Sequence, residues 1–162
     1  QLGVSKYEAT KFMLNYHAAY PEVETLRQRI VRDAYERGFV TTLGGRRRKI
    51  PQLVAARDRN PQSERFEDKL ERWFGERIAF NTPVQGGAAD IVKRAMLDFH
   101  AKRLGLDVNL VSQVHDELIV ECPQHKAEQV VEELKLSMVN AFPLDVPLLA
   151  EPKVGKTWDD CK

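Results

Sequence analysis

The protein has 162 residues, 43% hydrophobic and 30% charged, and its 25 Lys and Arg side chains stand against 24 Asp and Glu, a formal charge of +1. This apolar content excludes disorder and low-complexity sequence, and the length fits one domain or a domain with part of another. No apolar run approaches the roughly 18 residues that cross a bilayer. Cys122 and Cys161 are too few for a disulfide framework and lack metal-ligand spacing, so we expect a reducing, cytoplasmic location.

The balanced net charge hides an uneven distribution. Residues 1–106 carry 20 basic and 13 acidic side chains, whereas residues 107–162 carry 5 and 11. A basic body suits a protein that binds a polyanion, and an acidic end can concentrate carboxylates for metal ions. Ordinary solvated faces would give the same counts.

Two helices and a hairpin are predicted at the start of the chain. Ser5 followed by Glu8 matches a capping box for a first helix that ends near Tyr20. Apolar residues at intervals of three and four predict a second helix over residues 23–37, with Gly38 as its stop.

A β-rich segment over residues 39–43 then leads through two glycines into a run of four cations. This pattern predicts a hairpin with the basic residues on its returning arm. The guanidinium groups of Arg46, Arg47 and Arg48 are suited to binding phosphate oxygens in pairs.

The middle of the chain predicts a loop and two helical segments. Residues 55–64 are polar and loop-like, and helical spacing resumes from Phe66 to Phe80. Pro83 is expected to end that helix and to open a second one, capped by Thr82, that stops near Gly105. Trp73 is expected in the core, as is Phe74.

Arg77, Asn81 and Gln85 are spaced four apart and would share one face of a straight helix, although Pro83 should disturb it. Guanidinium and amide groups bind base edges and sugars through hydrogen bonds. An exposed polar face near a proline is the alternative.

The last third predicts a β-hairpin over residues 108–120, a helix over residues 127–141 and a strand over residues 146–154. His115, Asp116 and Glu117 lie at the hairpin tip, where burial between apolar strands would penalise unpaired charge. Asp116 could present its carboxylate to a divalent metal, with Glu117 pointing elsewhere. A plain turn is the alternative.

Three segments in this order resemble family A DNA polymerases of the DNA polymerase I type: residues 42–48 (TLGGRRR) with Pro51, residues 77–90 (RIAFNTPVQGGAAD) and residues 113–117 (QVHDE). The resemblance covers essentially the whole chain. It implies an α+β fold in which residues 1–43 form late fingers helices. Residues 44–162 would form the palm, with a basic hairpin, a template-contacting helix and a metal-binding hairpin on an antiparallel sheet, in an incomplete polymerase domain.

The resemblance also implies template-directed DNA synthesis from deoxynucleoside triphosphates onto a primer 3′-hydroxyl, with two Mg²⁺ ions. Asp116 resembles the second metal-binding aspartate of the palm, with Glu117 as an accessory carboxylate. His115 and Gln113 would face the primer end. Arg77, Asn81 and Gln85 resemble side chains that contact the template and the minor groove. The basic residues Arg46, Arg47 and Arg48 would contact the duplex, with a role in palm structure as the alternative.

The sequence departs from the family pattern in three places. Gly87 stands where the family usually has Thr, and residues 54–76 are longer and more charged than the usual connection. The apolar face in that stretch suits a lineage-specific insertion or a partner-binding helix; it comprises Phe66, Leu70, Trp73 and Phe74.

The third departure is that no segment matches the other palm aspartate or the nucleotide-binding fingers helix. We therefore expect the C-terminal part of a bacterial or viral replication or repair polymerase, inactive until a second polypeptide or a missing N-terminal part supplies those motifs. Its other partners would be primer-template DNA and deoxynucleoside triphosphates. A non-catalytic DNA-binding module is the alternative, and a metal-dependent hydrolase ranks last because the sequence offers no further carboxylate cluster.

Overall fold

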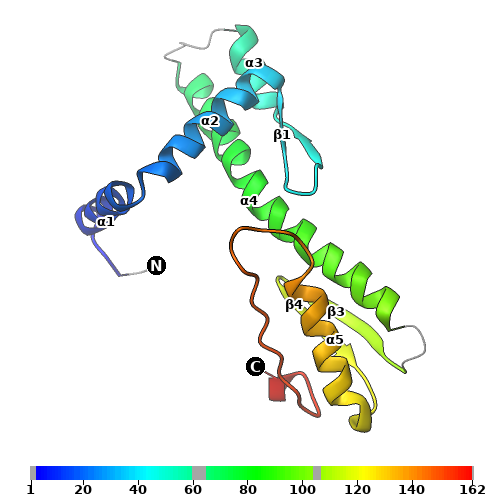
Figure 1. Ribbon diagram of the computed structural model, residues 1–162. Coiled ribbons are helices and arrows are strands. Elements are labelled where there is room, and N and C mark those ends of the chain that lie inside the picture. Colours follow the sequence, from blue (N-terminus) through cyan, green and yellow to red (C-terminus); the bar gives the residue numbers. More distant parts are fainter. Residues whose placement is uncertain (1–2, 60–64, 104–106, 162) are drawn as a thin grey trace. The chain divides into compact units, whose positions relative to one another are not determined.

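The computed structural model describes residues 3–59, 65–103 and 107–161. The chain combines helices with two small antiparallel sheets (Figure 1). It divides into two compact units, Gln1–Val84 and Gln85–Lys162, which are described in turn. Within the described residues, no helix combines the length and apolar character that a bilayer crossing needs.

The first unit begins with α1 (Lys6–Ala19) and α2 (Pro21–Arg37). The predicted capping box is confirmed: the backbone N–H of Glu8 donates to Ser5 Oγ at 3.2 Å, and the Glu8 carboxylate accepts from the backbone N–H of Ser5 at 2.8 Å. The predicted stop of α2 is confirmed as well. Gly38 has φ 75°, a left-handed conformation that residues with a side chain seldom adopt, and its N–H donates to the carbonyl of Ala34.

The expected basic hairpin is present. β1 (Phe39–Thr41) pairs antiparallel with β2 (Arg47–Lys49), with Val40 opposite Arg48. Val40 is buried, whereas every residue of β2 is exposed. The hairpin therefore buries one apolar side chain and leaves its cationic arm in solvent.

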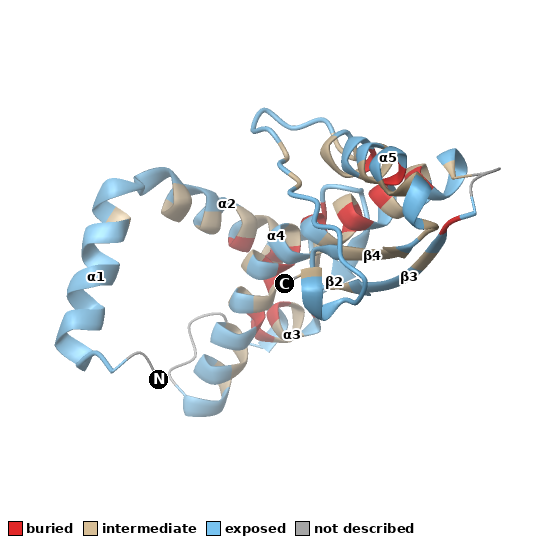
Figure 2. Cartoon of the chain, turned by 90° about the horizontal axis from the view of Figure 1, so that it is seen from below, coloured by how far each residue is buried: buried red, intermediate tan, exposed pale blue. Residues whose placement is uncertain are grey.

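A helix, α3 (Pro51–Arg59), replaces part of the loop expected over residues 55–64. That expectation is wrong for residues 55–59, and residues 60–64 lie outside the described residues. α3 forms because Leu53 and Ala56 are both buried, so tertiary packing outweighs its polar composition. The core of this unit, red in Figure 2, comprises Ala34, Val40, Ile50, Leu53 and Ala79.

The largest correction concerns Pro83, which lies inside α4 (Phe66–Lys102) and does not divide it. Thr82 does not cap a new helix: its hydroxyl donates back to the carbonyl of Ile78 at 2.7 Å. A proline inside a helix removes the bond to the carbonyl four residues earlier, here Ala79. One lost bond does not end α4, since buried residues on both sides of Pro83 anchor it. The stop expected near Gly105 lies outside the described residues.

The second unit contains the expected second hairpin and last helix. β3 (Asn109–Val114) pairs antiparallel with β4 (Glu117–Glu121), and α5 (Ala127–Val139) follows a short 3₁₀ turn (Gln124–Lys126). Partly buried residues of β4 and α5 pack on the core of this unit, which comprises Phe99, Val108 and Val130.

The strand expected over residues 146–154 is wrong: the described chain has no strand after β4, and only a short 3₁₀ turn (Asp159–Cys161) follows α5. Pro147 and Pro152 remove two ladder donors from this segment. The expected mixture of helices and antiparallel strands is confirmed, but the two hairpins form separate two-stranded sheets and not one sheet.

Candidate nucleic-acid interface

The three polar residues expected on one helix face lie on the same continuous helix. Arg77, Asn81 and Gln85 follow one another at successive turns of α4, and all three are exposed. Because α4 continues through Pro83, the one-turn spacing that the sequence pattern requires is retained. Guanidinium and amide groups at this spacing can donate to acceptors along a nucleic-acid groove.

Arg77 does not extend alone into solvent. Its guanidinium carbon lies 4.7 Å from the centroid of the Trp73 ring, one turn earlier on α4. Trp73 is 54% exposed and Phe74 is 49% exposed, so the expectation that both are core residues is wrong. The sequence pattern did not predict this contact, although an aromatic residue four positions before an arginine on a helix is a usable signal for it.

The three arginines of the basic hairpin make different contacts. The Arg47 guanidinium lies 4.9 Å above the Phe39 ring, and the backbone N–H of Arg46 donates to Thr42 Oγ1 at 3.3 Å. Arg48 Nη1 donates to the hydroxyl of the buried Thr82 at 3.3 Å, which links β2 to α4. Of the two roles that the sequence left open, Arg48 therefore has a structural contact.

The tip of the second hairpin is a two-residue turn, His115 and Asp116, closed by the pair Val114 and Glu117. His115 has φ 54°. Both favoured two-residue turn types require a positive φ at this first position, where glycine or asparagine is usual. The side chain of Gln113 donates to the carbonyl of His115 at 3.0 Å and so supports the turn. The chain thereby presents an imidazole beside two carboxylates on a rigid support.

The tip residues are all in solvent. His115, Asp116 and Glu117 are exposed, so none of them bears the cost of burying an unpaired charge. Carboxylate oxygens suit a hard divalent cation. However, among residues 3–59, 65–103 and 107–161 no three His, Cys, Asp or Glu side chains gather in a group that could hold a metal ion. Asp116 can serve as one ligand, but the described residues do not complete a site around it.

A β-bulge lies in β3, and the sequence pattern did not predict it. The pairing shifts between Leu110 and Ser112, which leaves Val111 without a cross-strand partner and 53% exposed. A bulge adds one residue to one strand and so changes which side chains reach the end of the hairpin. In β3 it sets the register of Gln113 opposite Leu118 and of the tip beyond it.

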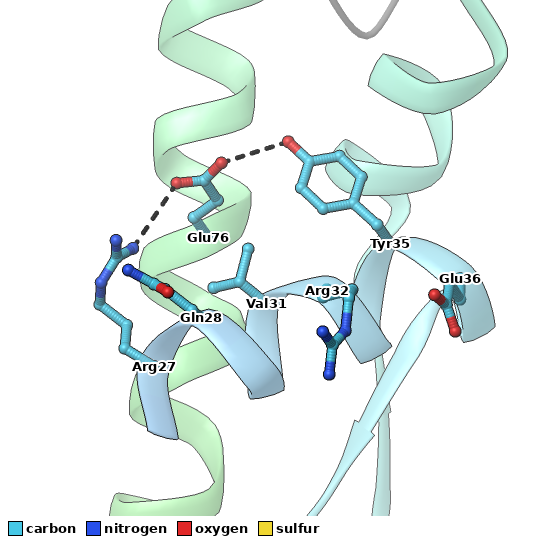
Figure 3. A pocket seen from close by; sticks show the side chains of 7 residues that line it. All are labelled: Arg27, Gln28, Val31, Arg32, Tyr35, Glu36 and Glu76. Carbon is cyan, nitrogen blue, oxygen red and sulfur yellow. Dashed lines mark hydrogen bonds and ion pairs between the residues drawn. The ribbon is translucent and has the colours of Figure 1, made fainter. Parts of the chain in front are cut away.

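The first unit also contains an open hollow of about 470 Å³ (Figure 3). Glu76 accepts from the Tyr35 hydroxyl at 3.3 Å and lies 3.9 Å from Arg27 Nη1. Burial, with the nearby Glu76 carboxylate, raises the pKa of Tyr35 to about 12. No residue predicted to bind DNA or metal lines the hollow; the lining comprises Arg27, Gln28, Val31, Arg32, Tyr35, Glu36 and Glu76. Three of its polar side chains, Arg27, Tyr35 and Glu76, contact one another, which indicates a structural role for this part of the hollow.

Known proteins match this chain along nearly its whole length. The family described as DNA polymerase family A matches residues 1–160. The thermostable DNA polymerase I of Thermus filiformis is 41% identical over 162 residues, covering 100% of this chain and 18% of that protein. DNA polymerase I of Bacillus caldotenax is 40% identical, covering 99% and 17%.

A solved structure agrees in fold. The POL domain of Pol1 from M. smegmatis, in complex with DNA primer-template and dNTP, superposes with a TM-score of 0.82 at 34% identity, covering 99% of this chain and 27% of that one. The chain thus spans less than a fifth of the length of these curated relatives. Since the family match extends over residues 1–160, the chain belongs to DNA polymerase family A.

Proposed function

We propose that this chain is the duplex-binding and partly catalytic C-terminal portion of a DNA-directed DNA polymerase. The observation that carries the proposal is the position of Asp116: it lies exposed at the tip of a tight hairpin, inside the motif by which the chain resembles the family. The M. smegmatis relative, described as bound to DNA primer-template and dNTP, supports the same substrates here. We place this activity in the cytoplasm, at sites of DNA replication or repair.

In this proposal the helix face of α4 binds the template and the minor groove. Arg77, Asn81 and Gln85 are exposed donors at one-turn spacing, and such groups hydrogen-bond to base edges and sugars. Arg46 and Arg47 bind duplex phosphates from the basic hairpin. Arg48 acts mainly through its bond to Thr82. Residues 1–43 remain assigned to the fingers and residues 44–162 to the palm.

At the hairpin tip, Asp116 is the metal ligand, Glu117 an accessory carboxylate, and His115 and Gln113 face the primer end. When bound, two Mg²⁺ ions align and neutralise the attacking and leaving oxygens. The described residues do not gather a complete ligand set, so we propose that this chain alone does not catalyse synthesis. A second polypeptide, or another part of the same protein, would supply the other aspartate and the nucleotide-binding helix.

A non-catalytic DNA-binding module is the second candidate, favoured by the incomplete ligand set among the described residues. It retains the roles of the α4 face and the basic hairpin but gives Asp116 no part in chemistry. The two candidates predict different effects on primer extension when the Asp116 carboxylate is removed.

The test is Asp116→Asn, assayed in a complex with a polypeptide that carries the missing polymerase motifs. We expect primer extension to fall at least about a hundredfold, while the Kd for primer-template DNA changes less than about twofold. Asp107→Asn is the matched control, because Asp107 is an exposed aspartate just before β3. Equal extension by Asp116→Asn and the unmodified complex would favour the binding module.

A further inference from the structure

Trp73 and Arg77 form an exposed pair on α4. Trp73 is 54% exposed, and the Arg77 guanidinium carbon lies 4.7 Å from the centroid of its ring. The nearest carboxylate in sequence, Glu76, binds Arg27 and Tyr35. In the part of the chain that the structure describes, no carboxylate forms an ion pair with Arg77.

This contact leaves the hydrogen-bonding capacity of Arg77 unused. A guanidinium group stacks on an aromatic ring through its flat face, whereas its five N–H donors lie in the plane and point outward from its edges. A salt bridge to a carboxylate would occupy two of those donors. The contact with Trp73 therefore restricts the Arg77 side chain without using its donors in a salt bridge.

We propose that Trp73 is a positioning residue for DNA binding, which holds Arg77 with its edge donors ready for acceptors in the duplex groove. The proposal rests on the proposed function, since it assumes that Arg77 contacts DNA. Fixing a free arginine side chain in a complex costs rotamer entropy. If the side chain is already restricted in the free protein, less of that entropy is lost when DNA binds.

Phe74 provides a matched control on the same helix. It is a neighbouring aromatic side chain with a similar exposed fraction, 49%, and the described structure shows no cation over its ring. Phe66 and Leu70 complete the exposed apolar face to which both aromatics belong. If this face acted as a general apolar surface, loss of Phe74 would matter as much as loss of Trp73.

The experiment measures the Kd of the chain for a labelled primer-template duplex by fluorescence anisotropy. We expect Trp73→Leu to weaken binding about two- to fivefold, as loss of an exposed cation–π contact implies. Trp73→Phe should retain part of the affinity, and Phe74→Leu should leave it unchanged. In an Arg77→Ala background, Trp73→Leu should cause no further loss, because the proposed effect passes through Arg77.

A second measurement needs no DNA. The indole ring current should move the Arg77 side-chain proton resonances upfield in the unmodified chain, and Trp73→Leu should abolish that shift while Phe74→Leu preserves it. Absence of the shift would overturn the proposed stack.

The binding outcomes separate the two proposals. If Arg77→Ala weakens binding and Trp73→Leu does not, Trp73 is not a positioning residue, although the proposed function stands. If Trp73→Leu weakens binding equally with and without Arg77, Trp73 contacts DNA itself and the inference is wrong. If Arg77→Ala has no effect, the DNA-binding role of Arg77 fails, and this inference fails with it.

Discussion

Arg48 Nη1 lies 3.3 Å from Thr82 Oγ1 and donates a hydrogen bond to it, while the Thr82 hydroxyl donates to the carbonyl of Ile78 at 2.7 Å. Thr82 is the residue immediately before Pro83, where α4 lacks one backbone donor. The basic hairpin is therefore attached to α4 beside the proline that interrupts its backbone hydrogen bonding.

This attachment predicts an energetic coupling between Arg48 and Thr82. Urea unfolding of Arg48→Met, Thr82→Val and the double variant should give a coupling free energy of about 1 kcal/mol, the usual net value of one hydrogen bond. Arg47→Met is the matched control, since Arg47 lies over Phe39 and does not reach Thr82. Strict additivity for Arg48 and Thr82 would mean that the bond contributes nothing to stability.

The close approach of α3 and α4 depends on Gly75. A Cβ atom at this position would lie 2.7 Å from Leu53 Cδ2 and 3.1 Å from the Gln52 Cβ. Alanine is favoured over glycine inside a helix by about 1 kcal/mol, but overpacking costs about 1–3 kcal/mol. Gln52 Cβ sits next to the backbone and cannot move far, so the clash should prevail.

Gly75→Ala is therefore expected to lower the free energy of unfolding by about 1 kcal/mol. Leu53→Ala alone should lower the free energy of unfolding by more than Gly75→Ala does. The double variant should lose less stability than the sum of the two single losses, because truncation of Leu53 makes room for the methyl group. Denaturant midpoints measure all three. A gain in stability from Gly75→Ala alone would show that α3 moves aside easily.

The hydrogen bonds of the Glu24 carboxylate predict that the stability contributed by this part of α2 depends on pH in the acid range. Arg27 donates to it at 2.8 and 2.9 Å and Gln28 donates at 3.0 Å, and these bonds, chiefly those of Arg27, lower the pKa of Glu24 from its usual 4.5 to about 2. A folded-state pKa below the unfolded one contributes stability above pH 4.5, and this contribution is lost as the pH falls towards 2. The pair is partly exposed, so the contribution is small.

NMR titration of the Glu24 side-chain carboxyl carbon should give a midpoint well below 4.5. The stability difference between the unmodified chain and Glu24→Gln should shrink from pH 5 to pH 2. Glu22→Gln removes the same charge from the same helical turn and should leave the Glu24 midpoint in place. A Glu24 midpoint near 4.5 would exclude a persistent bond to Arg27.

The features that the sequence predicted correctly are those set by neighbouring residues. The capping box of Ser5 and Glu8, the stop at Gly38 and the hairpin tip at His115 and Asp116 each depend on a few adjacent positions. The spacing of the polar residues on α4 follows from helical geometry alone. These local rules predict most of the helices and strands, and they predict which element carries each candidate site residue.

The errors arise where distant contacts decide. α3 is helical because Leu53 enters a core shared with other segments, and α4 passes Pro83 because buried residues lie in the turns before and after it. The contacts of Arg48 with Thr82 and of Arg47 with Phe39 depend on the hairpin register, which periodicity does not provide. Likewise, the bulge at Val111 leaves no mark in the alternation of side chains.

The positive φ of His115 predicts opposite effects on stability and on synthesis. A non-glycine residue in the left-handed region costs about 1 kcal/mol, so His115→Gly should raise the free energy of unfolding by up to about 1 kcal/mol. His115→Ala keeps the strain and should give no gain. If the imidazole faces the primer end as proposed, both variants should slow primer extension by the reconstituted complex, which makes the glycine variant more stable but less active.

Asp116→Gly is the stability control for this comparison. Among the described non-glycine residues only His115 has a positive φ, so glycine at Asp116 relieves no strain and should lower stability through its greater chain entropy. Urea unfolding gives the stability order, and single-turnover extension of a labelled primer gives the rates. If His115→Gly extends the primer at the full rate, the imidazole takes no part in synthesis. His115 would then only shape the turn that presents Asp116.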